Sequence, residues 1–151
     1  MDIRVQEAAF DLGQESNAFA SRQNGMGAIV TFTGVVRDLE GGDLHHMEIE
    51  HYPGMTESAL TDIAKDATDR WSLGDVLVIH RHGKLGPNDL IMMVATSSRH
   101  RVDAFKAAEF LMDFLKSRAP FWKKEATKDG TSWVAAKEED EVALAQWKTN
   151  Q

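Results

Sequence analysis

Basic residues are concentrated in one part of this sequence, in a pattern that suits an anionic ligand. Residues 99–128 carry eight basic and four acidic side chains, a net charge of +4, whereas the rest of the chain carries −11. Candidate ligand-binding side chains stand where elements should begin or turn, at Arg37, His100, Arg101, Lys116, Lys123 and Lys124. Two interpretations are open. Cations scattered over the surface would simply be solvated, whereas cations that converge in space would bind a phosphate or carboxylate group. We therefore predict one basic focus rather than a charged face.

Two of these residues could also perform acid–base chemistry. Lys116 and Lys123 are seven residues apart with Pro120 between them, so they do not share a helical face and meet only if the chain folds back at this corner. If they meet, repulsion between the ammonium groups and partial loss of water lower the pKa of one lysine. That lysine would donate or accept a proton near neutral pH.

Histidines form a second group of candidates. His80 and His82 lie on the same side of a predicted strand, and His45, His46 and His51 lie on another, so an imidazole metal site is one interpretation. The sequence contains neither cysteine nor an HExxH motif. We therefore expect structural, hydrogen-bonding histidines, and we predict no metal and no cofactor. The tryptophans could stack a flat heterocycle, although such residues are more often core or interface residues: Trp71, Trp122, Trp133 and Trp147.

Composition excludes several classes of protein. The 151 residues are 42% hydrophobic and 27% charged, with 11 Gly and 3 Pro, which predicts one globular domain over residues 1–151. No stretch approaches ~18 consecutive apolar residues, so we predict neither a membrane span nor secretion. The absence of cysteine excludes disulfides and cysteine nucleophiles and fits a reducing cytoplasm. The net charge of −7 argues against general binding to nucleic acid or anionic lipid.

The elements that must position these residues alternate along the first half of the chain. Residues 27–35 are rich in β-branched side chains and predict a strand, followed by a mobile polar loop at 38–43. Residues 44–51 alternate with period two and predict a half-buried strand. Thr56 is predicted to cap a helix that ends near residues 72–74, with an apolar stripe at Leu60, Ile63, Ala64, Ala67 and Trp71.

The second half predicts two strands, a helix and a hairpin. Residues 76–82 and 89–97 read as strands joined by a turn, the second one central in the sheet. A helix is predicted over 100–119, ended by Pro120, with one apolar face at Ala104, Phe105, Ala108, Leu111, Met112 and Leu115. An Asp-Gly turn should join strands at 121–127 and 132–136, before a short charged helix. The fold class is therefore α+β, with a mostly antiparallel sheet and two principal helices.

Five segments follow one another in a specific order: TFTGVVR (31–37), EHYPGMTE (50–57), HRHGKL (80–85), SRHRVDAF (98–105) and LKSRAPFWKKE (115–125). Together they resemble the catalytic large subunit of molybdopterin synthase, the MoaE family, over residues 25–133. The resemblance implies the α/β-hammerhead fold. It also implies a homodimer at the centre of a heterotetramer, with a small ubiquitin-like sulfur-carrier subunit at each end.

The activity that the resemblance implies is sulfur transfer. The C-terminal Gly-Gly thiocarboxylate of the carrier enters the active site and converts cyclic pyranopterin monophosphate into the dithiolene of molybdopterin. Two carrier molecules are used per product. The chain has no cysteine, so sulfur must arrive on a partner, and cations must bring the two anionic reactants together.

The family's functional residues carry over to individual positions. Lys116 and Lys123 match the catalytic lysines. Substrate-binding positions match Val35, Val36, Arg37, His100, Arg101, Lys124 and Glu125. Two departures stand out: Val35 occupies a position often held by Lys, which weakens a charge role there, and Arg99 adds a cation where a small residue is common.

Two other functions compete with this interpretation. A non-catalytic scaffold or regulator would keep the fold and bind the sulfur carrier, but the matched pocket cations are all present. A small RNA-binding module would stack bases on sheet aromatics, but the net charge and the absence of an RNP-type aromatic pattern argue against it.

Overall fold

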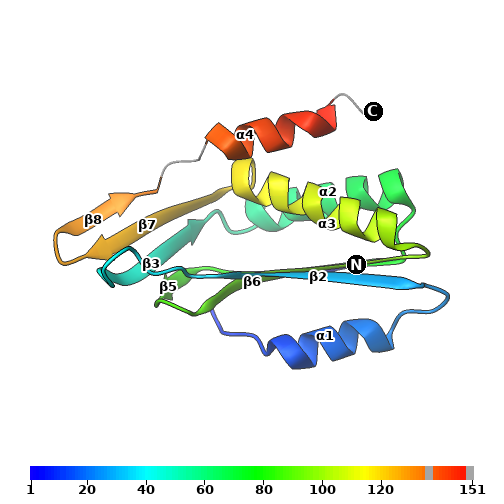
Figure 1. Cartoon of the computed structure of the whole chain (residues 1–151), viewed down its shortest axis with the longest axis horizontal. Coiled ribbons are helices and arrows are strands. Elements are labelled where there is room, and N and C mark those ends of the chain that lie inside the picture. The colour runs from blue at the N-terminus through cyan, green and yellow to red at the C-terminus, as the bar shows by residue number, and fades with distance from the viewer. Residues whose placement is uncertain (135–137, 149–151) are drawn as a thin grey trace.

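The computed structural model describes residues 1–134 and 138–148, which form two four-stranded sheets with four helices (Figure 1). The strands are β1 (Asp2–Gln6), β2 (Ala28–Val35), β3 (Leu44–His51), β4 (Asp75–Arg81), β5 (Gly83–Leu85), β6 (Leu90–Ser98), β7 (Phe121–Thr127) and β8 (Gly130–Trp133). The helices are α1 (Leu12–Ser21), α2 (Met55–Trp71), α3 (Arg101–Ser117) and α4 (Glu138–Ala145), followed by a 3-10 turn at Gln146–Lys148.

The first sheet has the strand order β1-β4-β6-β2 and is covered on both faces. The pair β1–β4 is parallel, and the other pairs are antiparallel. Helices α2 and α3 pack on one face, where Val78 and Val94 are buried, and α1 packs on the other, where Phe19 contacts Ile79 and Met93 (Figure 1). Burial on both faces explains why the central strand reads as an almost continuous apolar run.

The second sheet has the order β5-β3-β7-β8 and is antiparallel throughout. It extends past one end of the first sheet (Figure 1). The β7–β8 hairpin turns at Lys128 and Asp129, and Gly130 adopts a φ of 114°, a conformation that favours glycine. A small apolar cluster of Val36, Ile49 and Leu85, with neighbours, is buried where the two sheets meet.

The α+β class with mostly antiparallel pairing is confirmed, and α2 and α3 are the two principal helices. The strand at 44–51 and the helix end at Ser72 agree with the sequence patterns. Three elements were not anticipated: β1, α1 and the three-residue β5. The predicted turn at 83–88 is wrong in part, because β5 leaves the first sheet there and joins the second. Residues 135–136 of the last predicted strand lie outside the described residues.

Thr56 does not cap α2. The N-cap is Gly54, with a φ of 84°, and Thr56 is the second helical residue. Its buried hydroxyl accepts a hydrogen bond from the Tyr52 N–H and donates one of 3.0 Å to the Pro120 carbonyl. Thr56 therefore ties the start of α2 to the corner that leads from α3 into β7.

The apolar face predicted for α3 is wrong at one position. Phe105 is 61% exposed, whereas Phe110, which lay outside the predicted face, is buried against Trp71 and Trp147. α4 and the following 3-10 turn pack on α3 through Trp147, whose indole N–H donates to Asp113 at 2.7 Å. Of the helices in the described residues, none is both long enough and apolar enough to cross a membrane.

Candidate active site

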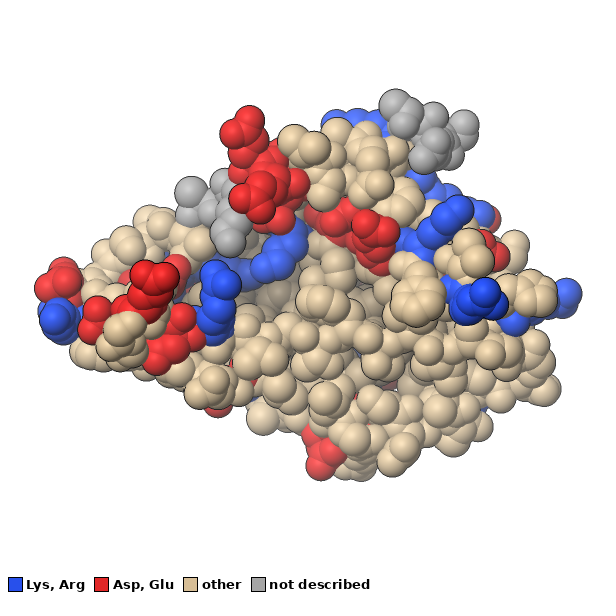
Figure 2. Space-filling model, viewed as in Figure 1, with Lys and Arg blue, Asp and Glu red and all other residues tan. Residues whose placement is uncertain are grey.

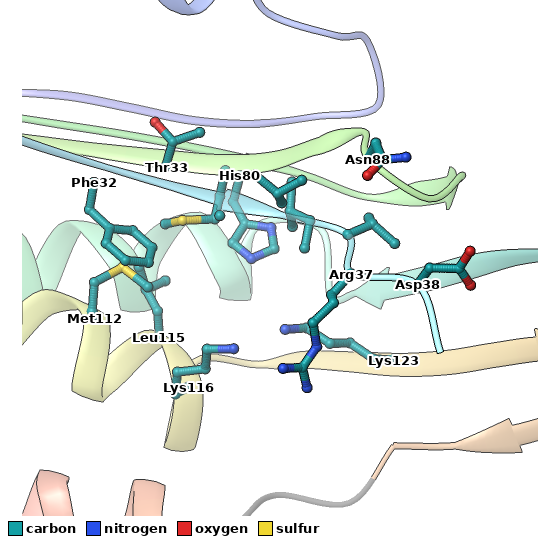
Figure 3. A pocket seen from close by; sticks show the side chains of 15 residues that line it. Phe32, Thr33, Arg37, Asp38, His80, Asn88, Met112, Leu115, Lys116 and Lys123 are labelled. Carbon is teal, nitrogen blue, oxygen red and sulfur yellow. The ribbon is translucent and has the colours of Figure 1, made fainter. Parts of the chain in front are cut away.

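A pocket of about 520 Å³ opens where the two sheets meet beside the C-terminal end of α3 (Figure 3). Its walls come from β2 and the loop that follows, from β4, β6 and α3, and from β7. Three cations line it: Arg37, Lys116 and Lys123. Figure 2 shows blue side chains gathered in a hollow between the second sheet and the helices. Three of the six predicted ligand-binding residues therefore converge, and they do so at the seam between the sheets.

The chain folds back between α3 and β7 and brings Lys116 and Lys123 to the same pocket. Lys116 occupies the last turn of α3, and Lys123 is the third residue of β7. The corner between them is closed by two N–H groups that donate to the Phe114 carbonyl and by the Thr56 hydroxyl on the Pro120 carbonyl. In Figure 3 the two ammonium groups point into the same space. The chain therefore does fold back at this corner, as the meeting of Lys116 and Lys123 requires.

The two lysines differ in environment. Lys116 is exposed, whereas Lys123 is largely buried. Burial first, and then the positive charge of Lys116, lower the pKa of the Lys123 ammonium from 10.5 to about 8, although Asp140 opposes this. Of the pair, Lys123 is therefore the residue suited to proton transfer near neutral pH.

The buried charge of Lys123 should cost stability, and Lys123→Met should recover it. At pH 7 we expect the free energy of unfolding to rise by about 1–3 kcal/mol, since each pKa unit corresponds to about 1.4 kcal/mol. The folded pKa of about 8 lies below the unfolded value of 10.5, so the folded wild type binds fewer protons between these pH values. Wild-type stability should therefore rise with pH across this window, and the advantage of the variant should vanish above it.

Urea unfolding of both proteins from pH 7 to 11 measures this difference. The matched control is Lys65→Met on the exposed side of α2, which should change stability by no more than about 0.5 kcal/mol at any pH. A Lys123→Met protein less stable than the wild type at pH 7 would show that the lysine is stabilised by contacts rather than strained by burial.

His80 forms part of the floor of the pocket. The residue is 3% exposed, and its ring stacks on Phe121 with 3.8 Å between ring centroids. Its Nδ1 lies 2.8 Å from the Arg81 carbonyl oxygen. Burial first, and then the charges of Lys123 and Lys116, lower the pKa of His80 to about 3, although the hydrogen bond to Arg81 opposes them. The imidazole is therefore neutral.

Several other predicted site residues lie in the same pocket. Val35, Val36 and Arg37 all line it. Lys124 and Glu125 do not: Lys124 projects from the opposite face of β7, where its ammonium lies 3.0 Å from Glu50 and 4.3 Å from the Trp133 ring centroid. Glu125 lies two residues beyond Lys123, outside the pocket lining.

His100 and Arg101 are not brought to this pocket within one chain. They form the N-cap and the first residue of α3, and Lys116 lies in its last turn. With a rise of about 1.5 Å per residue, the fifteen steps from Arg101 to Lys116 separate these two residues by about 22 Å along the helix. The predicted cluster is therefore split into a pocket at one end of α3 and a pair of residues at the other.

Sequence reasoning missed several lining residues. Phe32 and Met112 form an apolar wall, and Asp38 and Asn88 lie at the side of the pocket near Arg37 (Figure 3). The alternation of a strand could have identified Phe32 as a lining residue, because Phe32 and Gly34 are two positions apart in β2 and so share the face that points toward α3. Asn88 could not, because it belongs to a turn that neither periodicity nor charge distinguishes.

A second pocket of about 340 Å³ lies on the other side of the lysines. It shares Leu115, Lys116 and Lys123 with the first pocket and is otherwise lined by residues of the α3–β7 corner, the β7–β8 hairpin and α4, among them Ser117, Trp122, Trp133 and Asp140. The Ser117 hydroxyl oxygen is buried and has no hydrogen-bond partner in the described residues. The two lysines thus stand between two hollows.

The histidines occupy separate positions rather than one cluster. His51 and His82 lie close together, with 4.1 Å between ring centroids, while His80 points into the first pocket. Across residues 1–134 and 138–148, no group of three or more His, Cys, Asp or Glu side chains is placed to hold a metal ion.

Comparisons with known proteins agree with one another. The model of the MoaE protein family matches residues 5–118. The protein named molybdopterin synthase catalytic subunit in Cereibacter sphaeroides is 63% identical, in an alignment that covers 97% of this chain and 100% of that relative. The protein of the same name in Escherichia coli is 51% identical, and the alignment covers 96% of this chain and 97% of that relative. Among solved structures, the molybdopterin biosynthesis MoaE protein of Burkholderia ambifaria superimposes with a TM-score of 0.83 at 51% identity, covering 97% of both chains. Molybdopterin synthase from Staphylococcus aureus gives 0.78 at 30% identity, covering 87% and 96%.

Proposed function

The chain belongs to the MoaE protein family, and from this premise we propose that it is the catalytic subunit of a molybdopterin synthase. Its role is in the biosynthesis of the molybdenum cofactor. In the proposed reaction it transfers sulfur from the C-terminal thiocarboxylate of a small carrier protein to cyclic pyranopterin monophosphate. The observation that carries the proposal is the convergence of Arg37, Lys116 and Lys123 in one pocket of a chain that has no cysteine.

Each transfer begins with attack of the thiocarboxylate sulfur on a carbon of the pterin substrate. At one carbon the oxygen that sulfur replaces leaves as water; at the other it leaves as an oxygen of the phosphate, so that the cyclic phosphate opens to a monoester. Each attack joins the carrier to the substrate through a thioester. A water molecule then hydrolyses each thioester, leaving sulfur on the substrate and a carboxylate on the carrier. Two such cycles give the dithiolene. Negative charge develops on the acyl oxygen when water attacks, and an ammonium group at the site stabilises it.

The two pockets suit the two reactants. The larger one has the volume of a small-molecule site and carries the cations that a phosphate needs. The second, lined by Trp122 and Trp133, is open to an extended peptide tail, and glycines at the end of that tail permit close approach. The reactants would then meet at Lys116 and Lys123, which line both pockets.

We propose that the protein acts as a homodimer whose two-fold axis lies beside α3 and the free edge of β2. Three apolar side chains on this side are exposed: Phe32 at 42%, Val102 at 53% and Phe105 at 61%. Antiparallel packing of two copies of α3 places the start of one helix beside the end of the other. His100 and Arg101 of the partner subunit would then complete the pocket that contains Lys116.

Subunit mixing tests this arrangement. Arg101→Ala should mainly raise KM for the precursor, because a guanidinium that grips phosphate does so in ground and transition states alike. Light scattering at micromolar concentration should give twice the chain mass. After exchange between equal amounts of Lys116→Ala and Arg101→Ala proteins, half of the dimers have one intact site, so activity at low precursor should recover to about a quarter of wild type. A monomer mass, or no recovery on mixing, contradicts the shared site.

Reconstitution tests the function itself. Purified protein, thiocarboxylated carrier and cyclic pyranopterin monophosphate should together form molybdopterin under anaerobic conditions. A carrier without its last two residues should give none, because its globular part cannot reach the lysines. Failure to form product with a carrier that is competent with another synthase would favour a non-catalytic scaffold that only binds the carrier.

A further inference from the structure

His80 is a buried polar residue in the pocket to which the proposed reaction gives no role. Its ring is fixed in place by the structure around it. His80 lies in β4 at a position that is paired on one side with β1 and on the other with β6. Its ring stacks on Phe121 at an interplanar angle of 17°. Figure 3 shows the ring projecting from the sheet into the pocket, on the side that faces Lys116 and Lys123.

The hydrogen bond at Nδ1 determines which nitrogen faces the pocket as an acceptor. A backbone carbonyl only accepts hydrogen bonds, so Nδ1, 2.8 Å from the Arg81 oxygen, must carry the proton. In the neutral ring, Nε2 therefore presents a lone pair. In the described part of the chain, the bond from Nδ1 is the ring's only hydrogen bond.

An acceptor at this depth complements the rest of the lining. Arg37, Lys116 and Lys123 offer hydrogen-bond donors alone and suit the anionic parts of the reactants. The carboxylate of Asp38 is exposed and accepts from the N–H groups of Leu39 and Leu44 in its own loop. A pterin ring also carries N–H donors, and a buried N–H without an acceptor weakens binding.

We propose that Nε2 of His80 accepts a hydrogen bond from an N–H group of the pterin ring, so that His80 orients the heterocycle while the cations hold the phosphate. The inference rests on the proposed function, and it makes His80 a binding residue of that site. Because the pKa of His80 is about 3, the acceptor is present throughout the pH range of an assay. The ring does not serve as the general base, since its neutral form is so weakly basic.

Two substitutions separate the acceptor from the ring. His80→Phe keeps the stacking on Phe121 and removes the acceptor, and His80→Gln loses the ring but offers an amide oxygen near the position of Nε2. We expect His80→Phe to raise KM for cyclic pyranopterin monophosphate by roughly three- to tenfold, as for loss of one neutral hydrogen bond, with kcat changed less than about twofold. His80→Gln should recover most of this loss. The matched control, His82→Phe, lies outside the pocket lining and should keep the wild-type KM.

A second measurement uses the unmodified protein. In ¹⁵N NMR of histidine-labelled wild type, the Nε2 resonance of His80 should be that of an unprotonated nitrogen and should move on addition of the precursor alone, without carrier. A resonance that does not move, or precursor binding by His80→Phe equal to wild type while the protein folds normally, overturns the role of His80. Product formation by wild type in the same preparation shows that the proposed function stands apart from this result. Failure of wild type to form product would count against that function instead.

Discussion

Replacement of Lys116 by alanine is expected to lower kcat by about a hundredfold or more and to leave the fold intact. Lys116 is exposed in the last turn of α3, so its loss should change the free energy of unfolding by no more than about 0.5 kcal/mol. In the proposed reaction its ammonium stabilises the charge that develops on the acyl oxygen, and an interaction made chiefly in the transition state affects kcat rather than KM. Steady-state kinetics with saturating carrier and varied precursor measures the effect.

The same variant should also change the pH dependence of the remaining activity. The charge of Lys116 is one cause of the lowered pKa of Lys123, so its removal should move the alkaline limb of the kcat/KM profile above pH 8. Lys65→Ala, on the exposed side of α2, is the control and should keep both kcat and the limb. A Lys116→Ala enzyme with near-normal kcat would remove Lys116 from the chemistry.

Replacement of Lys123 by methionine should also lower kcat by about a hundredfold or more, with a different pH signature. Methionine approximately fills the volume of the lysine stem but cannot carry a proton. In the wild type the Lys123 ammonium of the free enzyme is present below a pKa of about 8, so kcat/KM should fall as pH rises through that value. The variant should lack this limb altogether, because the titrating group is absent. Profiles of kcat and of kcat/KM for the precursor from pH 6 to 10, with saturating carrier, test both statements.

Stability measurements distinguish loss of chemistry from loss of structure. Because Lys123→Met is expected to be more stable than wild type, a fall in kcat in this variant cannot be assigned to unfolding. If the variant kept the alkaline limb, another group would be responsible for the titration. An intact kcat would place Lys123 outside the reaction.

The corner that joins α3 to β7 shows how far sequence patterns reach. Helical periodicity and Pro120 correctly predicted where the helix ends and the hairpin begins. They could not show that the chain folds back sharply enough to join Lys116 and Lys123. That geometry is stabilised by a hydrogen bond from Thr56 to Pro120, 64 positions apart in the chain, whereas the local pattern predicts only that Thr56 caps a helix. Local patterns contain no signal for such a distant contact.

The short strand β5 illustrates a second limit. Three residues are too few to show either the two-residue period of a strand or the 3.6-residue period of a helix. Residues 83–88 therefore resemble a simple turn in the sequence. His100 and Arg101 illustrate a third limit. The resemblance implies that both are site residues, but similarity between sequences does not say which copy of a chain supplies each residue. Single-chain geometry raised that question by placing them at the far end of α3.

The position of the pocket at the seam gives Lys123 a use as a reporter. Lys116 is carried by a helix packed on the first sheet, whereas Lys123 is carried by a strand of the second. A small rotation of one sheet against the other changes the separation of the two ammonium groups, and their repulsion changes with it. Titration of Lys123 followed by NMR therefore acts as an internal gauge of the angle between the sheets. Recorded with and without a docked carrier that lacks its last two residues, so that no tail enters the pocket beside Lys123, the titration would report hinge motion between the unbound and assembled states without any attached probe.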